Sequence, residues 1–389
     1  MNPNKENKGA IFISVGLFSL VVVLMMLPSY ELLVKPRGQA FDWFWIWAGG
    51  RAVLTGQNPY GPETTQIIQL GVFRKIIPRD EYQHGFPHPA HIALVMLPLI
   101  SLPFVWSVLL WLSLQIPLFM VAFFIGCQVL NYSMRPYLLF LLILLTSLGF
   151  RYPLNVYVLG QLTIFIIFCA LLSAWLFQQQ HPRWAAGVLA CITVRPDLAL
   201  LVILPAFILI RNSPRRNEFI ITLLSVGLIL ALLPAIFIGF WPIKWFNALG
   251  TYSDNPFATW PPELLPTFWL MAGLLVGMTA WLGRYISLVW QKPSYFHNNL
   301  MVSATILFGL IVLPQTGSYT LTLALIPAMI LLCYARPLWL RIIIIISLLM
   351  PWLYFLIGKP FDTLIFLLIP GQFIVLQEIV RRFPVHLRA

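Results

Sequence analysis

The chain has 389 residues, of which 60% are hydrophobic and only 9% are charged, and its mean hydropathy is +0.87. Soluble domains carry about 25% charged residues, so this composition excludes a water-soluble globular protein and indicates a membrane protein. The net charge of +12 is assigned to cytoplasmic loops that contact anionic lipid, and nucleic acid is not expected as a partner.

The first apolar run, residues 10–27, follows two lysines and is long enough to cross a bilayer. It lacks a small-x-small cleavage site, so a retained span is predicted rather than a signal peptide. Polar or proline-rich breaks separate ten further runs, at about 92–130, 136–150, 157–178, 184–210, 218–240, 263–283, 299–313, 318–335, 338–357 and 361–380. We expect an all-α polytopic transmembrane bundle of about 12 membrane helices, which forms a single domain over residues 1–389.

The distribution of basic residues predicts the topology. When the runs alternate from a cytoplasmic N-terminus, most arginines fall on the cytoplasmic side, which satisfies the positive-inside rule. The run 184–210 is basic at both ends and is interrupted by Arg195-Pro196-Asp197. Because proline disfavours helix at the preceding residue, this run is predicted to be a hairpin of two short helices. Both termini are then cytoplasmic in a multi-pass protein of the cell membrane.

The first outer loop, residues 29–89, holds most of the polar side chains that could carry chemistry. Trp43 to Leu54 and Thr64 to Ile76 have the spacing of aromatic-rich or amphipathic helices that lie in the membrane interface. Asn58-Pro59-Tyr60-Gly61-Pro62 between them is typical of a turn. The run 92–130 contains two early prolines, which indicates a short interfacial helix before a full span.

Two charged residues have two interpretations each. Asp42 either caps a helix that starts at Trp43 or acts as a catalytic base. Arg195, near mid-membrane, either pairs with Asp197 or holds an anionic ligand, because a cation at this depth needs a partner. Arg51 either extends toward lipid headgroups or contacts a phosphate or sugar.

Three histidines, His84, His88 and His91, lie within eight residues. Their spacing is similar to that of metal ligands, but Pro87 and Pro89 break the helix that would align the rings. Polar contacts to a sugar or phosphate are favoured, and no metal site is predicted. Asp254, in a later outer loop, either binds an acceptor or lies in a solvated turn, and the residues alone favour the turn. Gln161 and Thr163 at a helix end are explained by capping or by sugar contact.

An ordered set of short motifs resembles a known family. After one span comes an Asp before an aromatic helix, then Gly56-Gln57-Asn58-Pro59-Tyr60, and then Phe86-Pro87-His88-Pro89 at the return to the membrane. Gly160-Gln161 opens a later helix, and Arg195-Pro196 lies inside a broken span. Over residues 1–215 this order resembles the GT-C superfamily of integral-membrane glycosyltransferases, and within it family 87. Relatives have Tyr-Pro-Pro at the return and more often Lys before the later proline, so the donor sugar is left open.

The resemblance implies transfer of a sugar, a mannose-like hexose or a pentose, from a polyprenyl-phosphate donor to an envelope glycan or glycolipid at the outer membrane face. It implies Asp42 as general base. The other residues that it suggests are Arg195, Arg51, Tyr60, His88 and Gln161 for the donor and Asp254 for the acceptor. It implies no cofactor, and its partners are the donor, the acceptor and membrane lipid.

Two other classes of membrane protein share some of these features. A lipid or lipid-linked sugar transporter would also have many spans and a broken helix, but transporters tend to pair broken helices in corresponding halves. The sequence shows one clear break, in its first half, and no internal repeat. A glycan polymerase or ligase would concentrate arginines in late outer loops, and these loops are poor in arginine.

Overall fold

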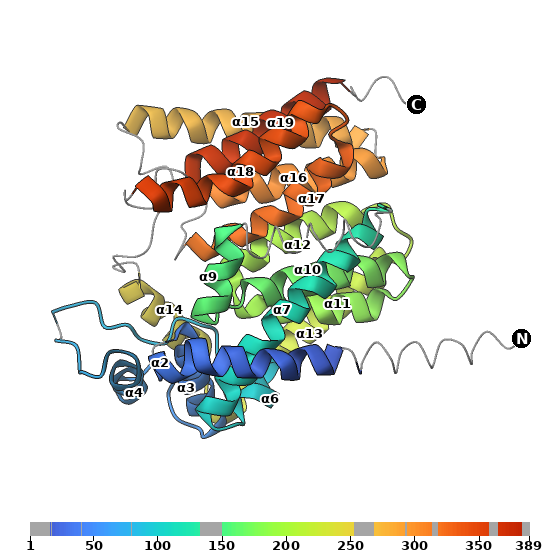
Figure 1. Ribbon diagram of the computed structural model, residues 1–389. Coiled ribbons are helices and arrows are strands. Elements are labelled where there is room, and N and C mark those ends of the chain that lie inside the picture. Colours follow the sequence, from blue (N-terminus) through green and yellow to red (C-terminus); the bar gives the residue numbers. More distant parts are fainter. Residues whose placement is uncertain are drawn as a thin grey trace, which may run out of the picture. The chain divides into compact units, whose positions relative to one another are not determined.

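The computed structural model describes residues 16, 18–39, 41–78, 80–132, 150–252, 268–291, 294–312, 318–357 and 365–382. Every regular element among these residues is a helix (Figure 1), so the predicted all-α class is confirmed for the described part. Contacts divide the chain into two compact units. Unit 1 comprises Met1–Val121, Tyr157–Gln161 and Leu230–Tyr252, and unit 2 comprises Ala122–Val156, Leu162–Ile229 and Ser253–Ala389. The prediction of a single domain over 1–389 stays a prediction.

The first long apolar helix of unit 1 ends later than the sequence indicated. The predicted span ends at residue 27, whereas the helix runs through Phe18–Arg37. Its last turns are a π-helix, η1 (Tyr30–Val34), and α2 (Lys35–Arg37). Pro28 supplies no backbone N–H, which removes one hydrogen bond of the helix, and the helix nevertheless continues past it into the π turn. The i,i+4 pair of Glu31 with Lys35, at 2.8 Å, adds to the same turns.

Two helices lie in the segment where the sequence indicated them, and their placement in an outer loop at the membrane interface stays a prediction. The first is α3 (Asp42–Leu54), which ends at Thr55 before Gly56 with φ +73°. The second, α4 (Pro62–Phe73), stops three residues before the predicted end. Arg74 adopts the left-handed conformation there, and Ile77 precedes a proline, which disfavours helix.

The remaining elements of unit 1 are α5 (Ile92–Val95), α6 (Leu97–Ile100), the first part of α7 (Phe104–Val129), the end of α13 (Arg216–Ile238) and α14 (Trp241–Tyr252). Short helices therefore precede a long apolar helix in the run 92–130, and the interfacial position of the short ones stays a prediction. A core cluster of Val53, Ala90, Ala93, Ile238 and Trp241 joins α3 to α14.

The backbone of α3 is in close contact with its neighbours at two adjacent glycines. A Cβ atom on Gly49 would lie 2.2 Å from the ring of Phe86, and one on Gly50 would lie 2.5 Å from the side chain of Ile100. The Phe86 ring is itself buried, at 2% exposure. The loop that carries Phe86 is therefore held directly against the helix that begins at Asp42.

Unit 2 contains the rest of α7 and of α13, most of α9 (Arg151–Leu159), and the helices and helical turns α10 (Thr163–Gln178), α11 (Pro182–Ala190), η3 (Cys191–Val194), α12 (Pro196–Ile210), α15 (Phe268–Gln291), α16 (Tyr295–Val312), η5 (Ser318–Ala324), α17 (Leu325–Tyr334), α18 (Leu338–Ile357) and α19 (Ile365–Arg382). Helix α16 is central, because most of its residues are buried and it packs against α12, α15, α17 and α19.

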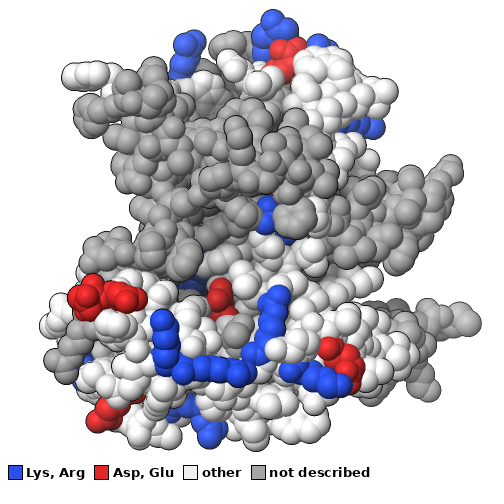
Figure 2. Space-filling view, turned by 60° about the vertical axis from the view of Figure 1, so that its left-hand side comes forward, with Lys and Arg blue, Asp and Glu red and all other residues white. Residues whose placement is uncertain are grey.

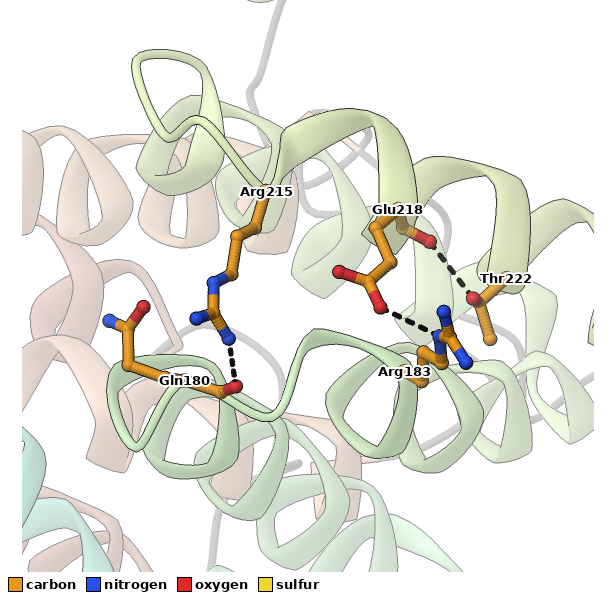
Figure 3. A network of polar contacts seen from close by, with 5 residues as sticks. All are labelled: Gln180, Arg183, Arg215, Glu218 and Thr222. Carbon is orange, nitrogen blue, oxygen red and sulfur yellow. Dashed lines mark hydrogen bonds and ion pairs between the residues drawn. The ribbon is translucent and has the colours of Figure 1, made fainter.

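The run 184–210 is broken at Arg195, where it was predicted to break, into α11 with η3 and then α12. Its two ends lie close together (Figure 3). Arg215 donates a hydrogen bond to the carbonyl of Gln180, and Arg183 forms a 2.6 Å ion pair with Glu218. The segment before α11 and the segment after α12 are therefore neighbours, as the hairpin interpretation requires.

Four described helices are long and apolar enough to cross a membrane: Phe18–Arg37, Phe104–Val129, Arg216–Ile238 and Tyr295–Val312. The pair α9 and α10 makes a fifth if it counts as one broken span, and four shorter apolar helices have 10–17 residues. Only 17% of the most apolar stretch of α13 is buried, against 72% for α16. Exposed apolar side chains such as Ile221, Leu224 and Ile236 on α13 suit contact with lipid.

The predicted run 136–150 lies outside the described residues except for its last position. The charged surface that the structure describes is mixed. On the face drawn in Figure 2, Lys and Arg side chains form a row in the lower part of the view, with acidic side chains at both of its ends.

Candidate functional site

Asp42 is the first residue of α3. The N-cap position before it belongs to Phe41, whose extended backbone (φ −129°, ψ 147°) starts the helix and whose side chain cannot cap. Asp42 is therefore not the N-cap that the capping interpretation proposed. A carboxylate in the first turn is still stabilised by the partial positive charge of the helix start.

The side chain of Asp42 is held by an amide from a distant part of the sequence. The Nε2 group of Gln161 donates a hydrogen bond to Oδ2 of Asp42. Gln161 is buried, at 6% exposure, and follows the end of α9. An amide donor orients a carboxylate without contributing charge, so two of the predicted site residues are brought together in unit 1.

A tryptophan stack positions the turn that carries Gln161. Gly160 has φ +74°, a left-handed conformation in which glycine is free of the Cβ penalty. Its carbonyl accepts a 2.8 Å hydrogen bond from Nε1 of Trp111. The ring of Trp111 stacks on that of Trp43, with ring centroids 4.7 Å apart, and Trp43 donates to Ser107 at 2.9 Å. Since Trp43 follows Asp42 on α3, the same stack fixes both partners of the Asp42–Gln161 bond.

The N-terminal helix supports the same segment. Arg37 donates a 2.8 Å hydrogen bond to the carbonyl of Val158, and the hydroxyls of Ser29 and Tyr157 are 2.8 Å apart. Trp111, Ser107 and Arg37 were not predicted as site residues. A tryptophan inside an apolar run is a usable signal for such a role, because a buried indole N–H needs an acceptor.

A polar pocket of about 260 Å³ lies in the same unit. It is lined by aromatic rings, amides and one lysine: Tyr60, Thr65, Tyr82, Gln83, His84, Gly85, Phe86, Pro87, Lys244, Asn247 and Ala248. Trp45, one turn along α3 from Asp42, donates to the carbonyl of His84 at 3.2 Å. The loop that forms one wall is therefore fixed to α3.

The titratable groups of this pocket are shifted by burial. Burial lowers the pKa of His84, so its ring is neutral at pH 7, and raises the pKa of the Tyr60 hydroxyl. Lys244 supplies positive charge, and it donates one hydrogen bond, of 2.9 Å, to the carbonyl of Ile238. Aromatic faces beside amide and ammonium donors are a combination that suits a sugar or an anionic group.

The three histidines have separate surroundings. His84 stacks on Trp45 with centroids 6.4 Å apart, whereas the His91 ring lies 5.8 Å from that of Trp241. His88 is buried, and its carbonyl accepts a 3.0 Å hydrogen bond from the predicted donor residue Tyr60. Among the residues that the structure describes, no three His, Cys, Asp or Glu side chains are grouped so that they could hold a metal ion.

Arg51 lies in the last turn of α3, nine residues and therefore about 13 Å along the axis from Asp42. It donates to the carbonyl of Ser101 at 3.1 Å, and its guanidinium lies 5.5 Å from the ring centre of Trp47. These contacts join the end of α3 to the end of α6. The structure does not bring Arg51 to Asp42.

Arg195 belongs to unit 2, at the N-cap of α12. Its side chain is 6% exposed and forms two hydrogen bonds with Asp197, at 3.0 and 2.7 Å. The guanidinium also lies 5.8 Å from the ring centre of Tyr319. The ion pair that was one of the two interpretations of Arg195 is therefore present. Asp254, the predicted acceptor residue, lies outside the described residues.

Comparison with family models, with curated proteins and with solved structures finds no match to this chain.

Proposed function

We propose that this chain is an integral-membrane glycosyltransferase that transfers a sugar from a polyprenyl-phosphate donor to a glycan or glycolipid acceptor. The observation that supports it most directly is the carboxylate of Asp42, fixed at the start of α3 by the amide of Gln161. A general base needs a defined orientation toward the hydroxyl that it deprotonates. A rigid helix end with a neutral, buried hydrogen-bond donor provides one.

The proposed reaction is a displacement at the anomeric carbon. The acceptor oxygen forms a bond to that carbon while the bond from the carbon to the phosphate oxygen breaks. The acceptor proton passes to Asp42, and the electron pair leaves with the lipid phosphate. No oxidant or reductant is needed, and the chemistry requires only a base and groups that bind the departing phosphate.

Arg195 is proposed to bind the donor phosphate. Its planar guanidinium forms a two-point pair with Asp197, which fixes the orientation of the group. Arginine matches phosphate geometry well, and an arginine held in place by a carboxylate loses less side-chain entropy when it binds a ligand. The pocket beside His84 and Lys244 is proposed to hold a sugar ring, with Tyr60 and the His88 backbone supporting its wall.

The proposed topology has about 12 membrane helices, interfacial helices in the first outer loop, cytoplasmic termini and an active site that faces outside. The pairing of the segments around Gln180 and Arg215 supports one part of it, namely that both ends of the run 184–210 face the same side. Single cysteines at Gln180 and Asn212, in a variant without the native cysteines, test this part. Neither should react with an impermeant reagent in intact cells, and labelling of only one would contradict the hairpin.

A transport function is the second candidate. The break between α9 and α10 adds to the break at Arg195, and broken helices are a feature of transporters. The discriminating experiment uses purified full-length protein with a panel of polyprenyl-phosphate sugars and an envelope lipid extract as acceptor. A transferase releases polyprenyl phosphate and gives a new glycosidic product, with Asp42→Asn protein as the blank. Movement of an unaltered donor across vesicles without product would support transport and overturn the proposal.

A further inference from the structure

Unit 2 contains a second and larger cavity, of about 420 Å³, that the proposed transfer reaction does not use. It lies between the end of α7 and helices α10, α12, α16 and α17, and apolar side chains form most of its wall. Small residues on α10 and α12 line it: Ala170, Ala174 and Ala206. Gly126 of α7 also borders it, but a Cβ there would lie 2.4 Å from the Met329 side chain, so this glycine serves close packing. The space has a size that can hold a ligand.

Polar groups that line the cavity are held by hydrogen bonds to one another or to a neighbouring side chain. The carbonyl of Val129 accepts hydrogen bonds from Gln178, at 3.1 Å, and from the hydroxyl of Tyr295. Asn299 donates to Tyr334 at 2.9 Å. The lining is therefore amphipathic, with a mostly apolar interior and a polar cluster formed where α7, α10 and α16 meet.

Two arginines are bonded to residues that line this cavity. Arg215 donates to the carbonyl of Gln180 (Figure 3), and Arg211 reaches the side-chain oxygen of Asn298 at 3.5 Å. Arg216 adds a third positive charge, donating to the Arg211 carbonyl at 3.3 Å. The acidic side chain beside them, Glu218, is paired with Arg183. Positive charge therefore exceeds negative charge in the loop between α12 and α13.

The location separates this feature from the proposed donor site. Arg195 is at the start of α12, whereas the cavity is lined by the second half of that helix, from Val202 to Ile210. Helix α12 has 15 residues and is therefore about 22 Å long. An apolar cavity with cations bonded to its polar lining is complementary to a lipid that carries negative charge on its headgroup.

We propose that this cavity holds an acyl chain of an anionic phospholipid, whose phosphate lies against Arg211 and Arg215. The site binds without covalent change. It does not depend on the transfer reaction, so its failure would leave the proposed function standing.

The test uses full-length protein in detergent and two lipids with the same chains, dioleoyl phosphatidylglycerol and dioleoyl phosphatidylcholine, with binding followed by native mass spectrometry. One phosphatidylglycerol should bind more tightly than phosphatidylcholine. Since each cation contributes about 1 kcal/mol of attraction to an anionic lipid, Arg211→Gln/Arg215→Gln should weaken phosphatidylglycerol binding about 30-fold. The matched control, Arg381→Gln/Arg382→Gln on α19, removes the same charge from side chains that do not line the cavity and should bind normally.

A second variant tests the cavity itself. Ala206→Trp places a large ring in the space and should abolish the tight site while Arg211 and Arg215 remain. If this variant does not fold, Ala174→Phe fills the same space from α10. Three results would overturn the proposal. The two phospholipids could bind with equal affinity, the α19 control could lose as much phosphatidylglycerol affinity as the Arg211/Arg215 variant, or a folded cavity-filling variant could bind phosphatidylglycerol as the unaltered protein does. Tighter binding of farnesyl phosphate, in competition with phosphatidylglycerol, would also overturn it by making the cavity an isoprenoid site.

Discussion

Asp42 and Arg195 are two charged residues of opposite sign, and the two compact units hold them in different ways. Asp42 is bonded to a neutral amide that is 119 positions away in the sequence. Arg195 is bonded to a carboxylate two positions away. A neutral partner orients a charge and leaves it as a charge, whereas an opposite partner compensates much of it. The two residues therefore differ in a partner that the structure gives each of them, an amide for Asp42 and a carboxylate for Arg195, and the variants below test what that difference does.

The largest effect is expected when Asp42 loses its basicity. Asp42→Asn keeps an oxygen that can accept the Gln161 hydrogen bond, so the fold should change little. It removes the group that takes the acceptor proton, and sugar transfer should fall by about 10²–10⁴-fold. Initial rates with one fixed donor and acceptor measure this. Asp80→Asn, which removes the same charge from an exposed turn, is the control and should retain its activity. Near-normal transfer by Asp42→Asn would leave Asp42 as a helix-start residue only.

The second largest effect is the loss of unfolding free energy when one partner of the Arg195–Asp197 ion pair is replaced. Asp197→Asn strands a guanidinium that is 6% exposed and should cost about 3–5 kcal/mol of unfolding free energy. Arg195→Gln leaves a carboxylate that is 33% exposed and can be hydrated, so it should cost less, about 1–3 kcal/mol. Denaturant titration of the solubilised protein gives both values, and the double variant should recover most of the loss.

The pair of Arg183 with Glu218 is the control for this comparison. Its side chains are 78% and 37% exposed, so Arg183→Gln should change stability by less than about 1 kcal/mol. Equal costs for Asp197→Asn and Arg195→Gln would show that burial of the stranded charge does not set the result. Donor affinity measured on stable Arg195→Gln protein separates a phosphate ligand from a structural ion pair, since only the ligand role requires the affinity to fall.

A smaller effect is expected at the turn that presents Gln161. Gly160→Ala places a side chain in a left-handed conformation and brings its Cβ to 3.0 Å from Cβ of Trp43. The expected cost is about 1–3 kcal/mol, with a loss of transfer activity because Gln161 shifts. Gly187→Ala on α11 meets nothing within 4 Å and should be neutral or stabilising by up to about 1 kcal/mol. Equal effects of the two changes would contradict a strained turn at Gly160.

The smallest effect is a pH dependence from His84. Burial lowers its pKa in the folded protein below the ordinary value of 6.5. As the pH falls below 6.5, the unfolded chain binds a proton that the folded chain does not, so stability should decrease toward acid. In the purified His84→Gln variant, the melting temperature should fall less between pH 6.5 and pH 5 than it does in the unaltered protein. An unchanged slope in the variant would assign the acid sensitivity to other groups.

The sequence predicted those features of the fold that depend on residues close together in the chain. The breaks at Thr55-Gly56 and at Arg195 follow from glycine and proline, and the Asp197 partner follows from its spacing. The predicted end of the first apolar helix was wrong, because the spacing of apolar residues does not show that the helix continues past Pro28 to Arg37.

The contacts around Asp42 could not be predicted from local rules. The partner Gln161 and the Trp111 support come from segments that the fold brings to α3, and apolar periodicity does not specify which long-range partners meet. The sequence singled out residues such as Gln161 and Tyr60 as polar groups in an apolar chain, and their roles in a site stay predictions. Their connections to Asp42 and to the His88 carbonyl depend on tertiary structure.

The close contact between Gly49 and Phe86 has a consequence for how this protein can evolve. A Cβ added at position 49 would lie 2.2 Å from the Phe86 ring where the ring now lies, so a side chain there requires that ring to move or to become smaller. A lineage that gains alanine at 49 must therefore also change the position or size of residue 86, and Phe86 is a wall of the polar pocket. Substitutions at these two positions should therefore occur together in related sequences. A change in the width of the pocket would then be accompanied by a change at position 49 of α3 as well as at position 86 of the loop.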